Sequence, residues 1–183
     1  MSKKSTSKTS ELKIPENVEV RIQGDNVIVK GPKGETGKKL ADPKLGMQVK
    51  DGKFIITNKK ISRSQKRVVN SFISHLKNLI RGATEGYVYK MKICSTHFPI
   101  SASVESGEVV IKNFFGEKVP RKARILSGVQ VTIDKDIITL EGTNKEDVGQ
   151  TAANIEQICR ITNRDRRIFQ DGCWITHKAG KEI

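Results

Sequence analysis

Hydrophobic and polar positions alternate along two pairs of short segments in the first third of the chain. Apolar residues take every second position over 18–22, and the turn-forming residues 24–26 separate them from the apolar run 27–29. A second pair, residues 47–49 and 54–56, flanks an Asp-Gly turn. Alternation of period two around a short polar turn is the pattern of a β-hairpin. The sequence therefore predicts two antiparallel hairpins joined by a long loop.

The period of the apolar positions then changes to that of an α-helix. Ser62 and Gln65 have the spacing of a capping box, in which the hydroxyl and the amide satisfy free backbone N–H groups. Behind them runs an apolar stripe that ends near Gly82. The stripe consists of Val68, Val69, Phe72, Ile73, Leu76, Leu79 and Ile80. Such a helix needs an apolar sheet to pack against, which predicts an α+β unit.

The same pattern occurs twice. Residues 27–57 match residues 109–139 without a gap at a spacing of 82, and 12 of the 31 positions are identical. Two unrelated segments of that length would share about two positions. Asn144 and Asp147 repeat the cap at the same spacing, and apolar residues coincide beyond the identities. The matched apolar pairs are Val18/Ile100, Val20/Ala102, Ile22/Val104, Ile73/Ile155, Leu76/Ile158 and Leu79/Ile161. The predicted fold class is α+β, a tandem duplication of a small domain with antiparallel strands packed on one helix.

The repeat sets the expected domain boundaries. We expect a flexible basic N-terminus (1–11), a first repeat (12–83), a second repeat (84–162) and a basic C-terminal tail (163–183). Residues 87–93 alternate and predict a further strand that could belong to either repeat. Domains of this size are only marginally stable alone, so the two lobes should pack on each other or on a large partner.

Composition narrows the class of partner. The chain has 34 Lys and Arg against 20 Asp and Glu, a net charge of +14 and a pI near 9.8. This balance favours a polyanion, which could be nucleic acid, an anionic membrane or an acidic protein. No apolar run approaches the length of a membrane span, and the polar N-terminus has no signal-peptide core, so we expect a soluble intracellular protein. Residues 1–83 hold 19 basic and 7 acidic side chains, whereas 84–183 hold 15 and 13.

Motifs for catalysis are absent from the sequence. Gly31 and Gly34 in GPKGE superficially resemble a phosphate-binding loop, but no Lys-Ser or Lys-Thr follows at the P-loop spacing, and a turn is the favoured interpretation. The three cysteines, at 94, 159 and 173, should be reduced thiols. Cys94-x2-His97 and Cys173-x3-His177 have zinc-ligand spacings. These pairs lie about 75 residues apart and have no equivalent in the first repeat, which favours a buried thiol and a surface imidazole over a metal site. We expect no cofactor and no metal.

Basic residues cluster in segments that carry candidate RNA contacts. They lie in the loop after VVIKNFFGE, in the equivalent loop of the first repeat, and in the segment after the second helix. The candidates are Lys118, Arg121, Lys122 and Arg124; Lys33, Lys38 and Lys39; and Arg160, Arg164, Arg166, Arg167 and Lys178. Lysine and arginine neutralise phosphates, and neighbouring aromatic residues stack on bases. The alternatives are a solvated charged loop and a frayed terminus in which Phe169 and Trp174 cover the second core.

The approach to the first helix is also strongly basic. Lys59, Lys60, Arg63, Lys66 and Arg67 lie before and within its first turns. Positive charge at a helix N-terminus opposes the helix dipole, so these residues do not serve stability. An external anion would relieve the repulsion.

Five motifs together resemble one known family. IPENV (14–18), VIVKGPKGE (27–35), HFPI (97–100), NFFGEK (113–118) and NRDRRIFQDG (163–172) are similar to the large-subunit ribosomal protein family numbered six in bacteria and nine in eukaryotes, in its eukaryotic and archaeal branch. The resemblance covers about residues 12–178 and includes the internal duplication.

The resemblance implies a structural role without catalysis, cofactor, membrane or small-molecule substrate. A member of this family would bind large-subunit rRNA near the sarcin-ricin stem-loop, beside neighbouring ribosomal proteins and the docking region of translational GTPases. It would act in the cytoplasm within the ribosome, after nucleolar assembly if the source is eukaryotic. In this family the second lobe and tail make the principal RNA contacts, which would assign phosphate neutralisation to Lys118, Arg121, Lys122, Arg124, Arg164, Arg166 and Arg167.

The charge count points to the first half instead. We expect total charge to set non-specific attraction and a few loops to set the docking surface. The alternatives are a free two-lobed RNA-binding chaperone or regulator and, more distantly, a metal-dependent nuclease.

Overall fold

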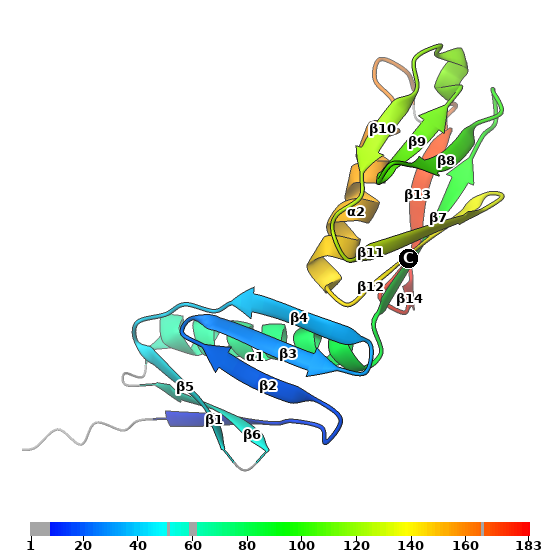
Figure 1. Ribbon diagram of the computed structural model, residues 1–183. Helices are drawn as coiled ribbons and strands as arrows, with labels where there is room; N and C mark the ends of the chain where they lie inside the picture. Colours follow the sequence, from blue (N-terminus) through cyan, green and yellow to red (C-terminus); the bar gives the residue numbers. More distant parts are fainter. Residues whose placement is uncertain (1–7, 51, 59–61, 166) are drawn as a thin grey trace, which may run out of the picture. The chain divides into compact units, whose positions relative to one another are not determined.

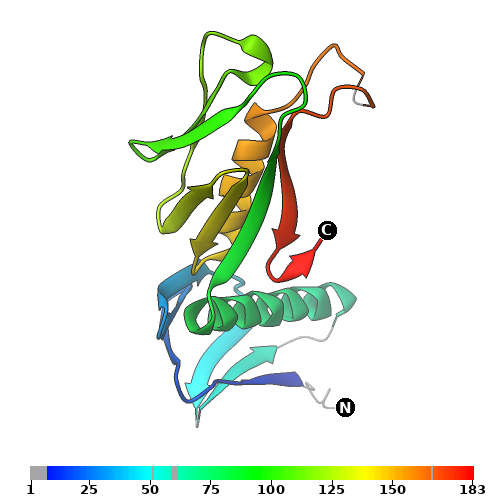
Figure 2. The ribbon, with the colours of Figure 1, turned by 90° about the vertical axis from the view of Figure 1, so that its right-hand side faces the viewer.

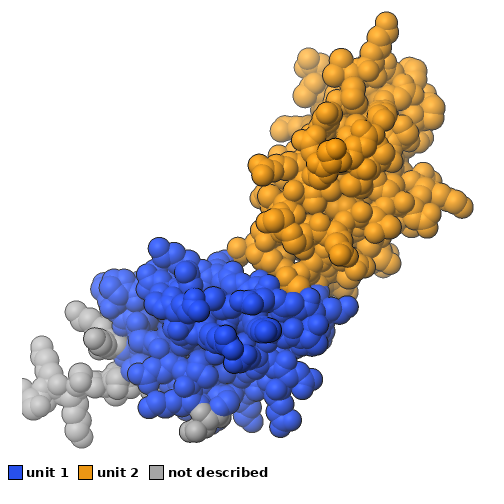
Figure 3. Space-filling model, viewed as in Figure 1, with its two compact units in different colours: residues 1–86 blue, residues 87–183 orange. Residues whose placement is uncertain are grey.

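A computed structural model describes residues 8–50, 52–58, 62–165 and 167–183. The chain divides into two compact units, residues 1–86 (unit 1) and 87–183 (unit 2), which are coloured separately in Figure 3. Both units combine antiparallel strands with one long helix, as Figure 1 shows. The predicted fold class, a duplicated α+β domain, is confirmed. Among the described residues, no helix is both long and apolar enough to cross a membrane.

Unit 1 consists of two three-stranded antiparallel sheets and a helix. The sheets have the orders β2-β3-β4 and β1-β6-β5. Helix α1 packs on β3 and β4, and its buried side chains share one core with the strands. The elements are β1 (Lys8–Lys13), β2 (Glu19–Gln23), β3 (Asn26–Gly31), β4 (Gly34–Lys39), β5 (Leu45–Lys50), β6 (Lys53–Asn58) and α1 (Arg63–Thr84). Both predicted hairpins are present, as β2-β3 and β5-β6.

Helix α1 begins where the sequence predicts, with half of the predicted capping box. The Ser62 hydroxyl accepts a hydrogen bond from the Gln65 backbone N–H at 3.2 Å. The Gln65 side chain does not complete the box, because its carbonyl oxygen is buried and has no hydrogen-bond partner among the described residues. Buried Val69, Phe72 and Leu76 form the apolar stripe that packs on the sheet. The apolar face therefore holds the helix on the sheet, and the Ser62 hydroxyl caps its N-terminus.

The long loop predicted between the hairpins contains a strand. Residues 34–39 form β4, which pairs antiparallel with β3. The sequence ETGKK is weak in β-branched and aromatic residues, which is why local preference does not predict a strand there. The GPKGE segment is the tight turn between these strands, as interpreted from the sequence. Gly31 is required there because a Cβ would lie 2.5 Å from the Ala83 carbonyl oxygen, which accepts a hydrogen bond from Lys33 N–H at 3.0 Å.

Unit 2 repeats this plan and adds two strands. Its sheets have the orders β10-β9-β8 and β11-β12-β7-β13-β14, and α2 packs on strands of both. The elements are β7 (Tyr87–Cys94), β8 (Ser101–Glu105), β9 (Glu108–Lys112), the 3-10 turn η1 (Phe114–Gly116), β10 (Arg121–Arg124), β11 (Val129–Asp134), β12 (Ile137–Gly142), α2 (Lys145–Ile158), β13 (Gly172–Lys178) and β14 (Lys181–Glu182).

Strand β7 is the counterpart of β1. β1 pairs antiparallel with β6, and β7 pairs antiparallel with β12 in nearly the same register, Lys8 opposite Asn58 and Tyr89 opposite Leu140. The structural repeat therefore runs from β1 to α1 and from β7 to α2. The strand whose membership the sequence left open belongs to the second copy.

The two ends of the chain differ from the sequence prediction. Residues 8–11, expected in a flexible N-terminus, lie in β1, while residues 1–7 fall outside the described residues. Residues 172–178, expected in a C-terminal tail, form β13 beside β7. The sequence does not predict β13, because its apolar and polar residues do not alternate regularly. Its pairing with β7 also shifts register between Ile175 and His177.

The ungapped repeat fails locally in two places. In the β3-β4 hairpin, six residues (30–35) connect the paired residues Val29 and Thr36. In the β9-β10 hairpin, nine residues (112–120) connect the equivalent pair, Ile111 and Arg121. On the helices, buried positions coincide at a spacing of 83 and not 82. The buried residues Val148, Ala152 and Ile155 of α2 correspond in this way to the buried residues Gln65, Val69 and Phe72 of α1. The longer hairpin end in unit 2 is the main departure from unit 1, and candidate binding residues lie on it.

Candidate nucleic-acid interface

Three loops of unit 2 meet at one end of its sheets. They are residues 95–100 between β7 and β8, 113–120 between β9 and β10, and 159–171 between α2 and β13, and we call them the loop cluster. Figure 2 shows all three at the end of unit 2 opposite the C-terminus. Arg166, one of the predicted contacts, lies outside the described residues of the third loop. The remaining residues of the cluster combine basic and aromatic side chains.

Asp171 ties the first loop to the third. Its carboxylate accepts hydrogen bonds from the backbone N–H groups of Thr96 at 2.6 Å and His97 at 3.0 Å, and from His97 Nδ1 at 2.6 Å. Burial of Asp171 would raise its pKa, but the hydrogen bonds from His97 and Thr96 outweigh burial and hold this pKa below its ordinary value. A carboxylate only accepts, so His97 carries its proton on Nδ1. The ionised carboxylate locks the two loops together.

The middle loop turns sharply through left-handed backbone. Asn113, Phe115 and Gly116 have φ values of 61°, 50° and 75°, and this conformation is costly for residues other than glycine. The Asn113 side-chain amide donates to the Pro99 carbonyl at 3.0 Å, which fixes the turn to the first loop. The turn points consecutive rings apart: Phe114 is buried, whereas Phe115 is half-buried.

An aromatic group joins all three loops. The His97 and Phe169 rings stack at 4.7 Å between centroids, and Phe115 lies 5.9 Å from Phe169 with its ring edge-on. The Arg164 guanidinium carbon lies 4.9 Å from the ring centroids of both Phe115 and Phe169. A guanidinium on aromatic faces keeps its charge and N–H donors available. This arrangement presents an exposed, positioned cation that can bind a phosphate or stack on a base.

Arg121, a predicted RNA contact, is held by internal bonds. Its guanidinium lies 4.2 Å from the Phe114 ring centroid, and Nη1 donates to the Ile158 carbonyl at 2.6 Å. The other two donor groups, Nε and Nη2, bind the Glu117 carboxylate. The hydrogen bond from Arg121 lowers the pKa of Glu117. Arg121 thus fastens the middle loop to the end of α2.

The other predicted contacts of unit 2 fall into two groups. Lys118, Arg160 and Arg167 are exposed residues of the loop cluster, and Arg167 forms an exposed ion pair with Asp165 at 2.9 Å. The second group lies on strands away from the cluster, with Lys178 opposite Tyr89 at the far end of β13 and Arg124 at the far end of β10. Lys122, on β10, has a distant partner in Glu108 at 3.9 Å. The structure therefore gathers only part of the predicted set.

The predicted contacts of unit 1 lie on and beside β4. Lys33 lies in the turn before this strand and is exposed, as is Lys39 at its end. Lys38 is half-buried, and its Nζ lies 3.2 Å from Nδ1 of His75 on α1. These residues extend along the flank of α1.

Sequence reasoning missed His97 and Asp171 as partners because they lie 74 residues apart. Phe169 is half-buried against His97, whereas Trp174 is 40% exposed, so Trp174 does not cover the core. Its indole N–H donates to the Gln170 carbonyl at 3.1 Å, and its ring lines a small pocket with Arg160 and Gln157. An exposed indole beside an arginine is a second stacking surface.

The residues of the zinc alternative are separately engaged. The His97 ring binds Asp171, and the His177 ring lies 3.2 Å from the Thr176 hydroxyl. The hydrogen bond with the Cys159 thiol and burial raise the pKa of Cys173, so Cys173 is a neutral thiol and a poor metal ligand. In the described ranges no group of three or more His, Cys, Asp or Glu side chains could hold a metal ion.

Comparison with known proteins gives the family. The model of the family "Ribosomal protein L6" matches residues 14–86 and 98–172, one segment in each structural repeat. The protein named "Large ribosomal subunit protein uL6" of Methanocella arvoryzae is 44% identical over 173 residues, which cover 94% of this chain and 98% of that protein. Its namesake from Methanococcus vannielii is 41% identical over 173 residues (94% and 95%), and that of Methanothrix thermoacetophila is 44% identical over 167 residues (91% and 95%). This chain belongs to the ribosomal protein L6 family.

Proposed function

We propose that this protein is a non-catalytic constituent of the large ribosomal subunit, in the cytoplasm, and that it binds rRNA through the loop cluster of unit 2. The names of its archaeal relatives support large-subunit membership. The observation that carries the binding surface is Arg164, exposed and held over two aromatic rings where three loops meet. Lys118, Arg160 and Arg167 add exposed cationic side chains on two of the same loops.

The finer part of the proposal concerns the RNA and the neighbours. We place the loop cluster on rRNA near the sarcin-ricin stem-loop, beside other ribosomal proteins and the docking region of translational GTPases, as the family resemblance implies. An aromatic and arginine-rich surface suits a structured stem-loop, because unstacked bases and phosphates are presented there together. Arg166, in the same loop, belongs to the proposed contact set by its sequence position.

Binding of the full chain to purified archaeal large-subunit rRNA tests this surface. The variant R164Q/K118Q should weaken binding about tenfold at moderate salt and reduce the slope of log affinity against log salt by about two. The control K90Q/K135Q removes the same charge from exposed positions outside the loop cluster, and it should change affinity less than about threefold. Equal losses in the two variants would remove the loop cluster from the interface.

Sedimentation separates a ribosomal constituent from a free RNA-binding regulator. A constituent should follow the large subunit through a high-salt gradient of cell lysate, because a docked protein dissociates slowly. A mainly soluble pool that leaves the particle at high salt would contradict the proposal. A competing oligonucleotide of the sarcin-ricin stem-loop should displace the chain from rRNA if the finer placement is correct.

A further inference from the structure

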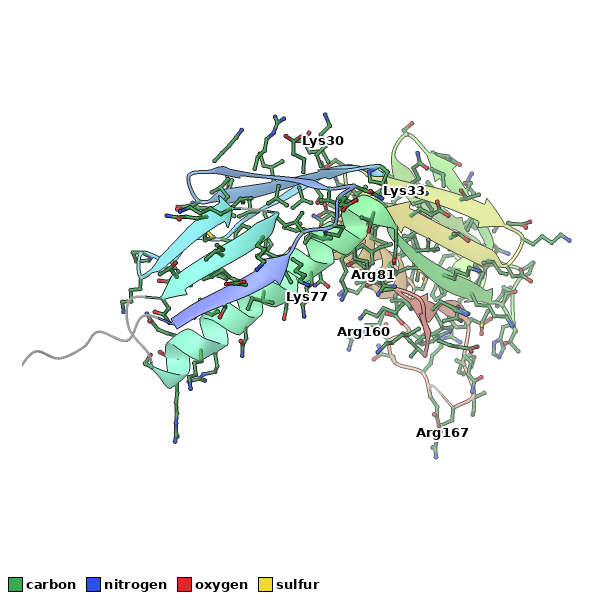
Figure 4. All side chains as sticks on the ribbon, turned by 90° about the horizontal axis from the view of Figure 1, so that it is seen from below. Lys30, Lys33, Lys77, Arg81, Arg160 and Arg167 are labelled. Atoms are coloured by element: carbon green, nitrogen blue, oxygen red, sulfur yellow. The ribbon has the colours of Figure 1, made fainter. Side chains whose placement is uncertain are left out.

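Helix α1 exposes a face that carries charge of one sign only. Its 22 residues include five basic side chains and no acidic one. The basic residues are Arg63, Lys66, Arg67, Lys77 and Arg81, and all five are exposed. At about 100° per residue they fall, with the uncharged Asn70 and Ser74, on about a quarter of the helix circumference. Figure 4 labels Lys77 and Arg81 on this helix.

This charge pattern works against the stability of the helix. Arg63 and Arg67 repel each other at a spacing of four residues, as do Lys77 and Arg81. Three of the basic residues lie in the first turns, which contain no acidic residue to offset the helix dipole. The one ion pair on this face that the structure shows, Arg81 with Glu85 at 2.9 Å, is exposed on both sides and contributes little. Folding alone gives no reason for this face.

The second copy of the fold shows that the scaffold does not need it. Helix α2, at the same place in the repeat, carries one basic residue, Lys145, and three acidic residues, Glu146, Asp147 and Glu156. Two of these acids lie in the first turn, where they suit the helix dipole. One fold thus accommodates helices of opposite charge. The basic face of α1 is specific to unit 1 and calls for an external polyanion.

The layout of the face matches a phosphate backbone. Its basic ends, Arg63 to Arg67 and Lys77 to Arg81, are separated by about 15 Å along the helix axis. Between them the uncharged Asn70 is exposed and can hydrogen-bond to phosphate or ribose hydroxyl groups. On the flank of the helix, outside this face, Lys38 of β4 lies 3.2 Å from His75, and the exposed Lys39 follows it. The face has no aromatic side chain for stacking on bases.

We propose that the exposed face of α1 is a second RNA-binding surface, which contacts the phosphodiester backbone of double-stranded RNA without reading its sequence. This second proposal depends on the proposed function in one respect only, namely that the chain binds rRNA. Unit 2 would fix the position through the loop cluster, and α1 would add affinity that depends steeply on salt. On this proposal, part of the excess positive charge of residues 1–83 lies on the exposed face of α1.

The test compares two variants of the full chain that each lose three charges. K66Q/R67Q/K77Q removes three of the five charges of the α1 face, and K13Q/K44Q/K50Q removes three exposed lysines elsewhere in unit 1. The probes are a 20-base-pair RNA duplex of arbitrary sequence and purified archaeal large-subunit rRNA. The α1 variant should lose at least about tenfold in affinity for both probes and about two to three in salt slope, whereas the control should lose less than about threefold. Circular dichroism should show unchanged helix content.

Each contrary result is distinguishable. Equal losses in the two variants would show that net charge alone is responsible, and the α1 surface would be withdrawn. Unchanged RNA affinity together with lost binding to polyglutamate would make the face a surface for acidic proteins, which also overturns the proposal. If the wild-type chain bound large-subunit rRNA no better than the duplex, the proposed function would fail, and the duplex data would still decide the α1 surface.

Discussion

Single residues in the loop cluster divide into those that hold the surface and those that present charge. Arg121 and Arg164 are both arginines beside phenylalanine rings. The Arg121 guanidinium is used by Glu117 and the Ile158 carbonyl, whereas no carboxylate of the described residues pairs with Arg164. Sequence alone cannot separate the two, because both lie in basic runs and their partners are set by the fold.

Substitution of Arg121 should therefore reduce stability rather than RNA affinity. R121Q removes the hydrogen bonds to Glu117 and Ile158 and the contact with Phe114, so we expect a loss of about 1 to 3 kcal/mol in the free energy of unfolding. R164Q should lose less than about 1 kcal/mol. Urea denaturation of the two variants measures this difference. If R121Q kept wild-type stability and weakened rRNA binding as much as R164Q does, Arg121 would be an RNA contact.

Asp171 should make the stability of unit 2 depend on pH. Its pKa is lowered in the folded state, so its contribution is present above the unfolded value of about 3.9 and is lost as pH falls through the lower folded pKa. At neutral pH, D171N should cost about 1 to 3 kcal/mol, because the amide cannot hold His97 and both N–H groups in the same way.

Chemical denaturation of wild type and D171N at several pH values gives the measurement. The stability difference should shrink as the pH falls below about 4. A difference that grew as the pH fell below about 4 would contradict a lowered pKa of Asp171.

At the scale of elements, β13 is the principal addition to the duplicated plan. It pairs with β7, and its first residues, Gly172 and Cys173, are buried against the end of α2. In unit 1 the counterpart of β7 is β1, which lies at the edge of its sheet because no strand corresponds to β13 there. The loop that carries Arg164 and Phe169 leads directly into β13, so the strand anchors one side of the proposed interface.

Loss of β13 should unfold unit 2. A chain that ends at Asp171 leaves β7 paired only with β12, so β7 loses its backbone hydrogen bonds to β13, and Cys159 loses the buried Cys173 that covers it. A control chain that ends at Lys178 loses β14 alone and should keep its fold. Thermal unfolding followed by circular dichroism compares the two. A full cooperative transition without β13 would show that β7 needs no partner on that side.

Sequence periodicity predicted the elements with strong apolar patterns and missed those without them. The hairpins β2-β3 and β5-β6 and both helices follow clear alternation or a helical stripe. Strands β1, β4 and β10 were not predicted, because lysine, arginine, glycine and other polar residues give them no apolar alternation, and pairing with a neighbour makes them strands. Strand β13 was missed because its apolar residues do not alternate regularly with polar ones. The basic and aromatic candidates could be found from composition, but the Asp171 to His97 lock required the fold.

At the scale of the whole molecule, the two units carry their positive charge in different ways. Unit 2 concentrates exposed cations on loops around aromatic rings, a geometry that suits a particular RNA structure. Unit 1 spreads them along a helix face without aromatic residues, which suits any phosphate backbone. The family resemblance points to unit 2 as the RNA-binding part, whereas the charge count points to unit 1. Under our proposals, unit 2 determines where the protein docks and unit 1 adds attraction to RNA of any sequence.

The equivalence of β1 and β7 bears on how such a chain came to exist. Because each copy starts with its own strand and ends with its own helix, neither copy borrows an element of the repeat from the other. A single uninterrupted stretch of coding DNA, copied once in head-to-tail order, is enough to account for both. No permutation of the gene and no exchange of strands between ancestral monomers is needed.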